Sequence, residues 1–168
     1  MVTTEEAIKV LDCSEDHIII NIQVLPAGFV RGYLMNDIDW RRPYRVIVHP
    51  SADNDSTSIR IWMTSVVKIP TRAIRKAVER ARVWLNYGCI GSDPRGAVSF
   101  RYEEDIDLSP AQLVILLGKM ITFIHLFELQ VTFYTMLDSG VHRTIVKQIM
   151  NNFGGWKDKS ARLFGGVL

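Results

Sequence analysis

The histidines and carboxylates are the residues of this chain best suited to chemistry, but their spacing assembles no familiar centre. The four histidines are scattered and form neither an HxxxH nor an HExxH pattern. One pair stands out, because His125 precedes Glu128 by about one helical turn. A general base oriented by a carboxylate would use such a pair, and so would a structural histidine bonded to its neighbour. We expect the structural role and no catalytic residue.

Two acidic groups invite a divalent cation, but neither has a complete set of ligands. Asp53, Asp55 and Thr57 have the spacing of a calcium loop, yet the glycine and the final glutamate of such a loop are missing. A second acidic cluster fits a solvated turn before a helix, and it consists of Glu103, Glu104, Asp105 and Asp107. The glycines over residues 88–96 match no phosphate-binding pattern. We expect no metal and no cofactor.

Basic side chains gather on one predicted helix, over residues 71–86. Thr71 can cap this helix, apolar residues fall on one side, and a mostly basic face lies on the other. Such a face can bind a nucleic acid or an acidic partner, and Trp40 and Tyr44 would add stacking beside it. A solvated helix face gives the same pattern. The candidate partner-binding residues on this helix are Arg72, Arg75, Lys76, Arg80 and Arg82.

The composition is that of one soluble globular domain with little excess charge. The chain has 168 residues, of which 48% are apolar and 23% charged, and its formal net charge is +2. Nucleic-acid binders usually have a larger basic excess, so this balance does not favour one. The two cysteines are isolated and the first residues include acidic ones, which fits a reducing compartment better than a secretory route. We expect a cytoplasmic protein.

Hydrophobic periodicity predicts an α+β fold, in which an antiparallel meander sheet carries an N-terminal helix, a middle amphipathic helix and a long C-terminal helix. The expected strands are residues 17–25, 29–35, 44–49, 58–67, 89–92 and 97–103. The expected shorter helices are residues 3–11, 71–86 and 141–152. An apolar stripe on the last helix consists of Val141, Ile145, Ile149 and Phe153.

The chain divides into a single domain over residues 1–153 and a C-terminal tail over residues 154–168. A glycine pair after the last predicted helix fits a helix stop. The tail is basic and carries large apolar side chains. These can bind a partner subunit, bind the chain's own domain, or make no contact at all. Two of them, Trp156 and Phe164, complete the candidate partner-binding residues.

The longest apolar run, residues 109–137, predicts a helix roughly 40 Å long. Ser109 fits the N-cap, Pro110 the first helical position and Gln112 the partner in a capping box. The run is long enough for a bilayer, but charged side chains in its interior make that costly, and we expect no membrane span. Polar residues wind around the helix, so either the helix kinks or its apolar surface is covered on both flanks, by a second subunit in a homodimer or by the helix over residues 141–152.

The order of elements over residues 58–126 is similar to that of a known family. An alternating strand enters an amphipathic helix that ends in WLNYG, a hairpin with a glycine turn follows, and a leucine–serine pair precedes the long helix. This order resembles the YbjN-like bacterial proteins, described as sensory-transduction-regulator domains, whose fold is that of the type III secretion chaperones. The final helix is longer in this chain, and the stretch after Gly140 has no counterpart.

The resemblance implies an α+β domain, often a homodimer, that binds other proteins and carries no catalytic residues. We therefore expect a non-enzymatic protein-binding or chaperone-like adaptor, which is homodimeric. The alternative is a nucleic-acid or acidic-surface binder that uses the basic helix over residues 71–86. A third hypothesis is a hydrolase or transferase whose site residues do not pair by sequence spacing.

Overall fold

The computed structural model describes most of the chain up to Asn152. The described residues are 1–12, 19–35, 43–50, 59–66, 71–85, 88–104 and 108–152. The expected tail over residues 154–168, with Trp156 and Phe164, lies outside them, as does Trp40.

Six strands form one antiparallel sheet in the order β1-β2-β3-β4-β6-β5. The first four strands form a meander, and β6 then pairs with β4 and carries β5 on its other side. The strands are β1 (Ile19–Val24), β2 (Val30–Leu34), β3 (Tyr44–His49), β4 (Ile59–Ser65), β5 (Cys89–Ser92) and β6 (Val98–Glu104). The predicted meander and hairpin are confirmed.

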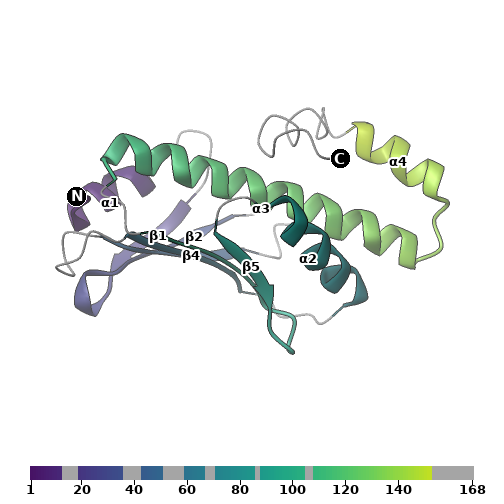
Figure 1. Ribbon diagram of the computed structural model, residues 1–168, viewed down its shortest axis with the longest axis horizontal. Helices are drawn as coiled ribbons and strands as arrows, with labels where there is room; N and C mark the ends of the chain where they lie inside the picture. The colour runs from purple at the N-terminus through teal and green to yellow at the C-terminus, as the bar shows by residue number, and fades with distance from the viewer. Residues whose placement is uncertain are drawn as a thin grey trace.

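The described helices all lie on one side of this sheet (Figure 1). The longest, α3, runs along the sheet, with α1 near its first half, α2 near its second half and α4 on its far side (Figure 1). The helices are α1 (Thr4–Asp12), α2 (Arg72–Trp84), α3 (Pro110–Asp138) and α4 (Arg143–Asn152), with a short 3-10 turn η1 (Pro26–Gly28). The α+β class is therefore confirmed.

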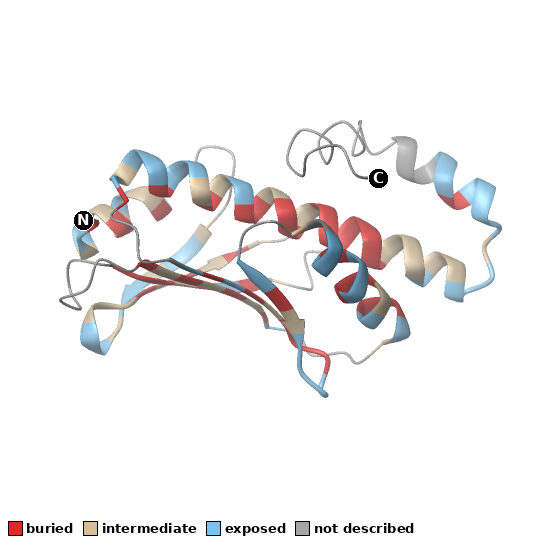
Figure 2. Ribbon diagram, viewed as in Figure 1, coloured by how far each residue is buried: buried red, intermediate tan, exposed pale blue. Residues whose placement is uncertain are grey.

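The core lies between the helices and one face of the sheet (Figure 2). Side chains alternate along each strand, so that Val46 and Val48 of β3 are fully buried whereas Arg45 is exposed. Phe100 of β6 packs on Phe123 of α3, with ring centroids 4.8 Å apart. Each large apolar side chain buried in this way contributes about 1.5–3 kcal/mol to stability.

Two helices begin with a reciprocal capping box, and the one at Ser109 is the box that the sequence predicts. The Ser109 hydroxyl oxygen accepts from the N–H of Gln112 at 3.3 Å, and the Gln112 side-chain oxygen accepts from the N–H of Ser109 at 2.8 Å. Thr3 and Glu6 form the same reciprocal pair at the start of α1. The hydrogen bonds that the Glu6 carboxylate accepts from the Thr3 N–H and hydroxyl lower the pKa of Glu6.

The middle of α3 is enclosed on every side. Residues 126–131 are all buried, which a helix with one solvated face would not allow. The sheet lies beneath this segment, and α1, α2 and α4 all contact α3 (Figure 1). This arrangement confirms that the apolar surface of the long helix is covered on more than one flank.

The hydroxyl groups on α3 bond to the backbone of the same helix. Thr122, Thr132 and Thr135 each donate to the carbonyl oxygen four residues earlier, over 2.8, 3.0 and 2.7 Å. Such a bond satisfies the hydroxyl without water. These threonines can therefore lie on a largely covered part of the helix without water as a partner.

By length and composition alone, α3 could also cross a membrane. Its most apolar window has a mean hydropathy of 1.6, and 61% of that window is buried inside the structure. The core helix of a soluble protein passes the same test, so this helix is weak evidence for a span. The absence of a membrane span stays a prediction.

The apolar stripe predicted on the last helix is contradicted at Ile145, whereas Phe153 and the side chain of Ile149 lie outside the described part of the chain. Ile145 is 50% exposed, whereas its neighbour Val146 is fully buried. The reason is that α4 begins only at Arg143, so Val141 precedes the helix and does not set its phase. The alternative in which this helix folds back on the long one is what the structure shows within one chain, because α4 contacts α3.

The first strand, β1, is an irregular edge strand. Its register with β2 shifts between Ile20 and Gln23, and Asn21 has a positive φ of 54°. Gly32 of β2 is buried beside β1, and a Cβ at this position would stand 2.6 Å from the side chain of Ile19. The missing side chain therefore lets the two strands approach.

A second glycine sets the path from α2 into β5. Gly88 has a φ of +67°, and a Cβ there would stand 2.3 Å from the carbonyl oxygen of Arg101. Only glycine fits both the backbone angle and the contact. The β5–β6 turn follows, in which the Asp93 carboxylate accepts from the N–H groups of Arg95 and Ala97 at 2.8 and 2.9 Å.

Candidate functional site

The acidic residues singled out in the sequence do not form a metal site among the described residues. No three His, Cys, Asp or Glu side chains come together there in a way that could hold a metal ion. Glu103 lies instead 2.7 Å from the guanidinium of Arg60 on the neighbouring strand. The candidate calcium loop, with Asp53, Asp55 and Thr57, lies outside the described residues, and so do Asp105 and Asp107 of the acidic cluster.

The carboxylate of the His125–Glu128 pair belongs to the core. Glu128 is 2% exposed and accepts a hydrogen bond from the hydroxyl of Tyr44, which is 1% exposed on β3. Gln130 is 6% exposed, and its side-chain oxygen has no hydrogen-bond partner among the residues that the structure describes. This placement favours a structural role for Glu128. It also corrects the expectation for Tyr44, which lies in the core and cannot stack beside the basic helix.

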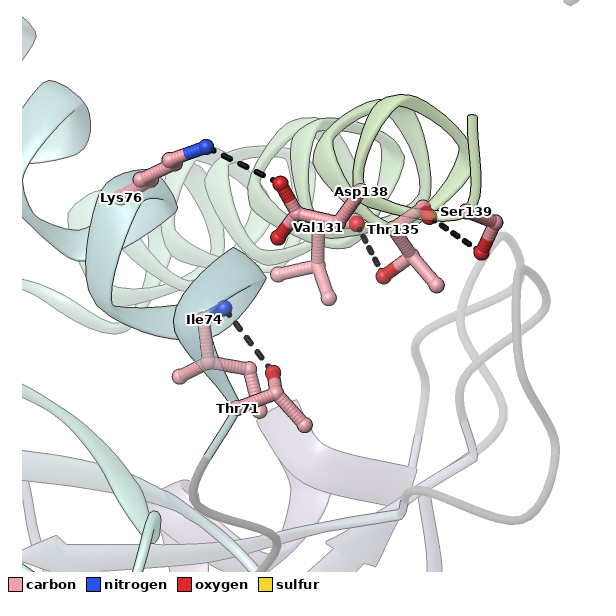
Figure 3. A network of polar contacts seen from close by, with 7 residues as sticks. All are labelled: Thr71, Ile74, Lys76, Val131, Thr135, Asp138 and Ser139. Atoms are coloured by element: carbon pink, nitrogen blue, oxygen red, sulfur yellow. Dashed lines mark hydrogen bonds and ion pairs between the residues drawn. The ribbon is translucent and has the colours of Figure 1, made fainter. Parts of the chain in front are cut away.

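The helix α2 carries the basic surface that the sequence predicts. The Thr71 hydroxyl caps this helix by accepting from the N–H of Ile74 at 3.1 Å (Figure 3). Lys76 is engaged within the chain, because its ammonium lies 3.0 Å from the carboxylate of Asp138 on α3 (Figure 3). The same ammonium lies 5.7 Å from the centre of the Tyr134 ring. The exposed residues of the basic face are Arg72, Arg75, Arg80 and Arg82.

The first half of α3 presents large apolar side chains to solvent. Val114 is 52% and Ile115 is 59% exposed, although the later turns of the helix are enclosed. Ala111 before them is exposed, and no atom lies within 4 Å of the place where a Cβ on Gly118 would stand. We call these four residues the α3 stripe. Contiguous exposed apolar surface is typical of protein–protein contacts.

The sheet has a second face, which none of the described helices covers (Figure 1). We call it the open face. Every second residue contributes a side chain to it, starting from the first residue in each of the ranges 29–33, 45–49, 60–64 and 99–103. The rings of Phe29 and His49 stack with their centroids 4.0 Å apart, and the ring centroids of Phe29 and Trp62 are 6.0 Å apart. The arginines of this face are Arg31, Arg45, Arg60 and Arg101.

The arginines of the open face differ in how far they are engaged. Arg31 donates to the side-chain oxygen of Gln23 at 2.6 Å and lies 5.9 Å from the centre of the Tyr33 ring. Arg60 contacts Glu103. Arg45 and Arg101 are exposed, and no carboxylate in the described parts of the chain pairs with them. These two guanidinium groups are therefore available to an anionic ligand.

A shallow depression of about 300 Å³ continues the open face at β5. Arg101 lies at its edge together with the exposed Cys89, its partner across the two strands. The Asp93 carboxylate also lines it but is held by the turn N–H groups. The depression therefore has one guanidinium that no described carboxylate pairs.

Sequence reasoning missed the open face because its residues are spread over four strands. Each strand shows only a short alternation, such as Arg31 with Tyr33 or Arg60 with Trp62. The available signal was the repeated pairing of an arginine with a large apolar or aromatic residue two positions later. That signal becomes a surface only once the strand order is known.

No family model, curated protein or solved structure matches this chain. The resemblance to the YbjN-like family and to the type III secretion chaperones is therefore neither supported nor contradicted by a neighbour. What the structure establishes is the class, namely an antiparallel six-stranded sheet with helices on one side in an α+β fold.

Proposed function

We propose that this protein is a non-enzymatic protein-binding or chaperone-like adaptor, which works as a homodimer in the cytoplasm. The observation that carries the proposal is the α3 stripe, where Val114 and Ile115 are more than half exposed on a helix whose central turns are buried. Burying a large apolar side chain stabilises a contact by about 1.5–3 kcal/mol. A second copy is the occupant that we favour.

A two-fold axis near Gly118 would bring two copies of the stripe together. The small residues Ala111 and Gly118 flank the large ones, so one helix can offer hollows to the protruding side chains of the other. A stable interface of this kind covers about 800 Å² on each partner. The resemblance to the YbjN-like family points the same way, since it implies a homodimer that binds other proteins.

Light scattering after gel filtration tests the homodimer. We expect a mass of twice the 19.2 kDa of one chain. The variant Val114→Glu with Ile115→Glu is expected to run as a monomer, because two buried carboxylates would face each other across the interface. Val83→Glu on α2 is the matched control, since Val83 is 70% exposed and lies outside the stripe. A wild-type monomer at every concentration would contradict the dimer.

Capture from native cytosol tests the adaptor role. Wild-type protein is expected to retain a specific partner protein that Val83→Glu also retains. An enzymatic turnover of a small molecule without any retained protein would contradict the proposal.

A second candidate function is the binding of a nucleic acid or an acidic surface through α2. The observation that favours it is the run of exposed arginines on one helix. Arg75→Glu with Arg80→Glu is expected to abolish retention on heparin if this helix is the binding surface. Full binding of a captured partner by the same variant would favour the adaptor.

A further inference from the structure

We propose that the open face of the sheet binds single-stranded nucleic acid, with a base stacked on Trp62 and phosphates held by Arg45 and Arg101. This surface is separate from the α3 stripe and from the basic face of α2. The proposal therefore stands or falls independently of the homodimer.

The aromatic rings supply a stacking platform in the middle of the sheet. Trp62 is half-buried on β4, Phe29 lies 6.0 Å from it, and His49 stacks on Phe29 at 4.0 Å. Such a layer holds the indole in place before a ligand arrives. Bases stack on sheet-borne rings in several RNA-binding folds, and each base contributes about 1–3 kcal/mol.

The guanidinium groups stand on both sides of that platform. Trp62 on β4 pairs with Arg101 on β6. On the other side, Arg45 on β3 pairs with Thr64, which is two residues after Trp62 on β4, so Arg45 is the diagonal neighbour of Trp62. Neighbouring strands lie about 4.8 Å apart, so a strand of nucleic acid crossing the sheet would meet Arg45, Trp62 and Arg101 in turn. Beyond Arg101 it would reach the depression beside Cys89, about 300 Å³ in volume.

The kind of charge also fits phosphate. The strand residues of the open face carry four arginines, one glutamate and no lysine. The planar guanidinium binds phosphate through two parallel N–H groups and also stacks on rings. The near-neutral charge of the whole chain, which does not favour a nucleic-acid binder, does not describe this local excess.

An acidic peptide is the competing ligand, and the rings argue against it. A peptide carboxylate would use the arginines but would gain little from a half-exposed indole. A nucleic acid uses both groups at once. The dependence of binding on Trp62 therefore separates the two ligands.

Fluorescence anisotropy with a labelled oligothymidylate and oligouridylate of about 12 nucleotides tests the proposal, since single-strand sites span about this length. Arg45→Glu with Arg101→Glu is expected to abolish binding, and Trp62→Ala to weaken it about tenfold. Trp62→Phe is expected to restore most of the affinity. Arg75→Glu with Arg80→Glu on α2 carries the same charge change and is expected to bind as the wild type does. Circular dichroism establishes that each variant is folded.

The other outcomes would overturn the proposal. Loss of binding in the α2 variant alone would move the site to that helix. Equal competition by polyglutamate, with no effect of Trp62→Ala, would identify an acidic-peptide surface. The absence of any oligonucleotide binding by the wild type at low salt would leave the open face without this ligand.

Discussion

The hydrogen bond between Tyr44 and Glu128 joins two elements that are 84 residues apart in the chain. Both side chains are almost fully buried, one on β3 and the other on α3. A buried carboxylate is stable only when donors satisfy it, so the bond selects one rotation of the helix over the sheet.

Removing the donor from this pair is expected to destabilise the fold. Tyr44→Phe leaves the buried Glu128 carboxylate without the Tyr44 hydroxyl and should lower the free energy of unfolding by about 3 kcal/mol. Urea unfolding measures the change. Tyr44→Phe combined with Glu128→Leu removes both polar groups and should recover much of the loss. A double variant as unstable as the single one would contradict this account.

Gly88 is expected to tolerate no side chain. Gly88→Ala places a Cβ against the carbonyl oxygen of Arg101 at a positive φ, which should cost on the order of 3 kcal/mol. Gly91→Ala is the matched control, because no atom lies within 4 Å of that Cβ position. We expect the control to change thermal stability by less than about 0.5 kcal/mol. If the two variants lost the same amount of stability, the close contact between residue 88 and the Arg101 carbonyl oxygen would not be the cause of the loss.

Residues that act locally were predictable, and residues that act across the fold were not. The Ser109–Gln112 capping box is visible in four consecutive residues, because both partners belong to one helical turn. The partner of Glu128 was hidden, because nothing near it in the sequence identifies Tyr44. The sequence offered His125 instead, which is one helical turn away.

At the scale of elements, α3 shows how an apolar helix can be polar in places. Its threonines bond to their own backbone, and its central turns are covered by other elements. The first residue of α3 was predictable from the capping box. The burial of its apolar surface by other elements was predictable as well, because its polar residues do not share one face. The phase of α4 was not, because Val141 looks helical in the sequence but precedes the helix.

Gly118→Ala is expected to have opposite effects on the monomer and on the dimer. Alanine favours a helix over glycine by about 1 kcal/mol, and the site has room for the added methyl group in one chain. At low protein concentration thermal stability should therefore rise. If the α3 stripe is the dimer interface, the same methyl group should weaken self-association in a dilution series. An equal gain at every concentration would remove Gly118 from the interface.

At the scale of the whole molecule, the sheet separates two surfaces of different character. The helices lie on one side (Figure 1). The arginines and rings of the open face lie on the other side. The fold class was predictable, because it depends on periodicity within each segment. The open face was not, since it depends on which strands are neighbours.

The protein is expected in the soluble fraction of a cell lysate made without detergent. The buried Glu128 and Gln130 lie within α3, and a carboxylate at the centre of a bilayer costs about 2.5–3.5 kcal/mol. High-speed centrifugation and immunoblotting measure the distribution. Recovery only in the membrane pellet, with release by detergent but not by high salt, would contradict this expectation.

The kinked first strand limits how far copies of this molecule can join. A regular outer strand would accept the backbone of another chain, and that chain would accept the next, so fibres could grow. The left-handed residue Asn21 interrupts the row of hydrogen-bonding groups on one border, and the opposite border strand has only four residues. Concentrated solutions of the protein should therefore not form amyloid-like aggregates.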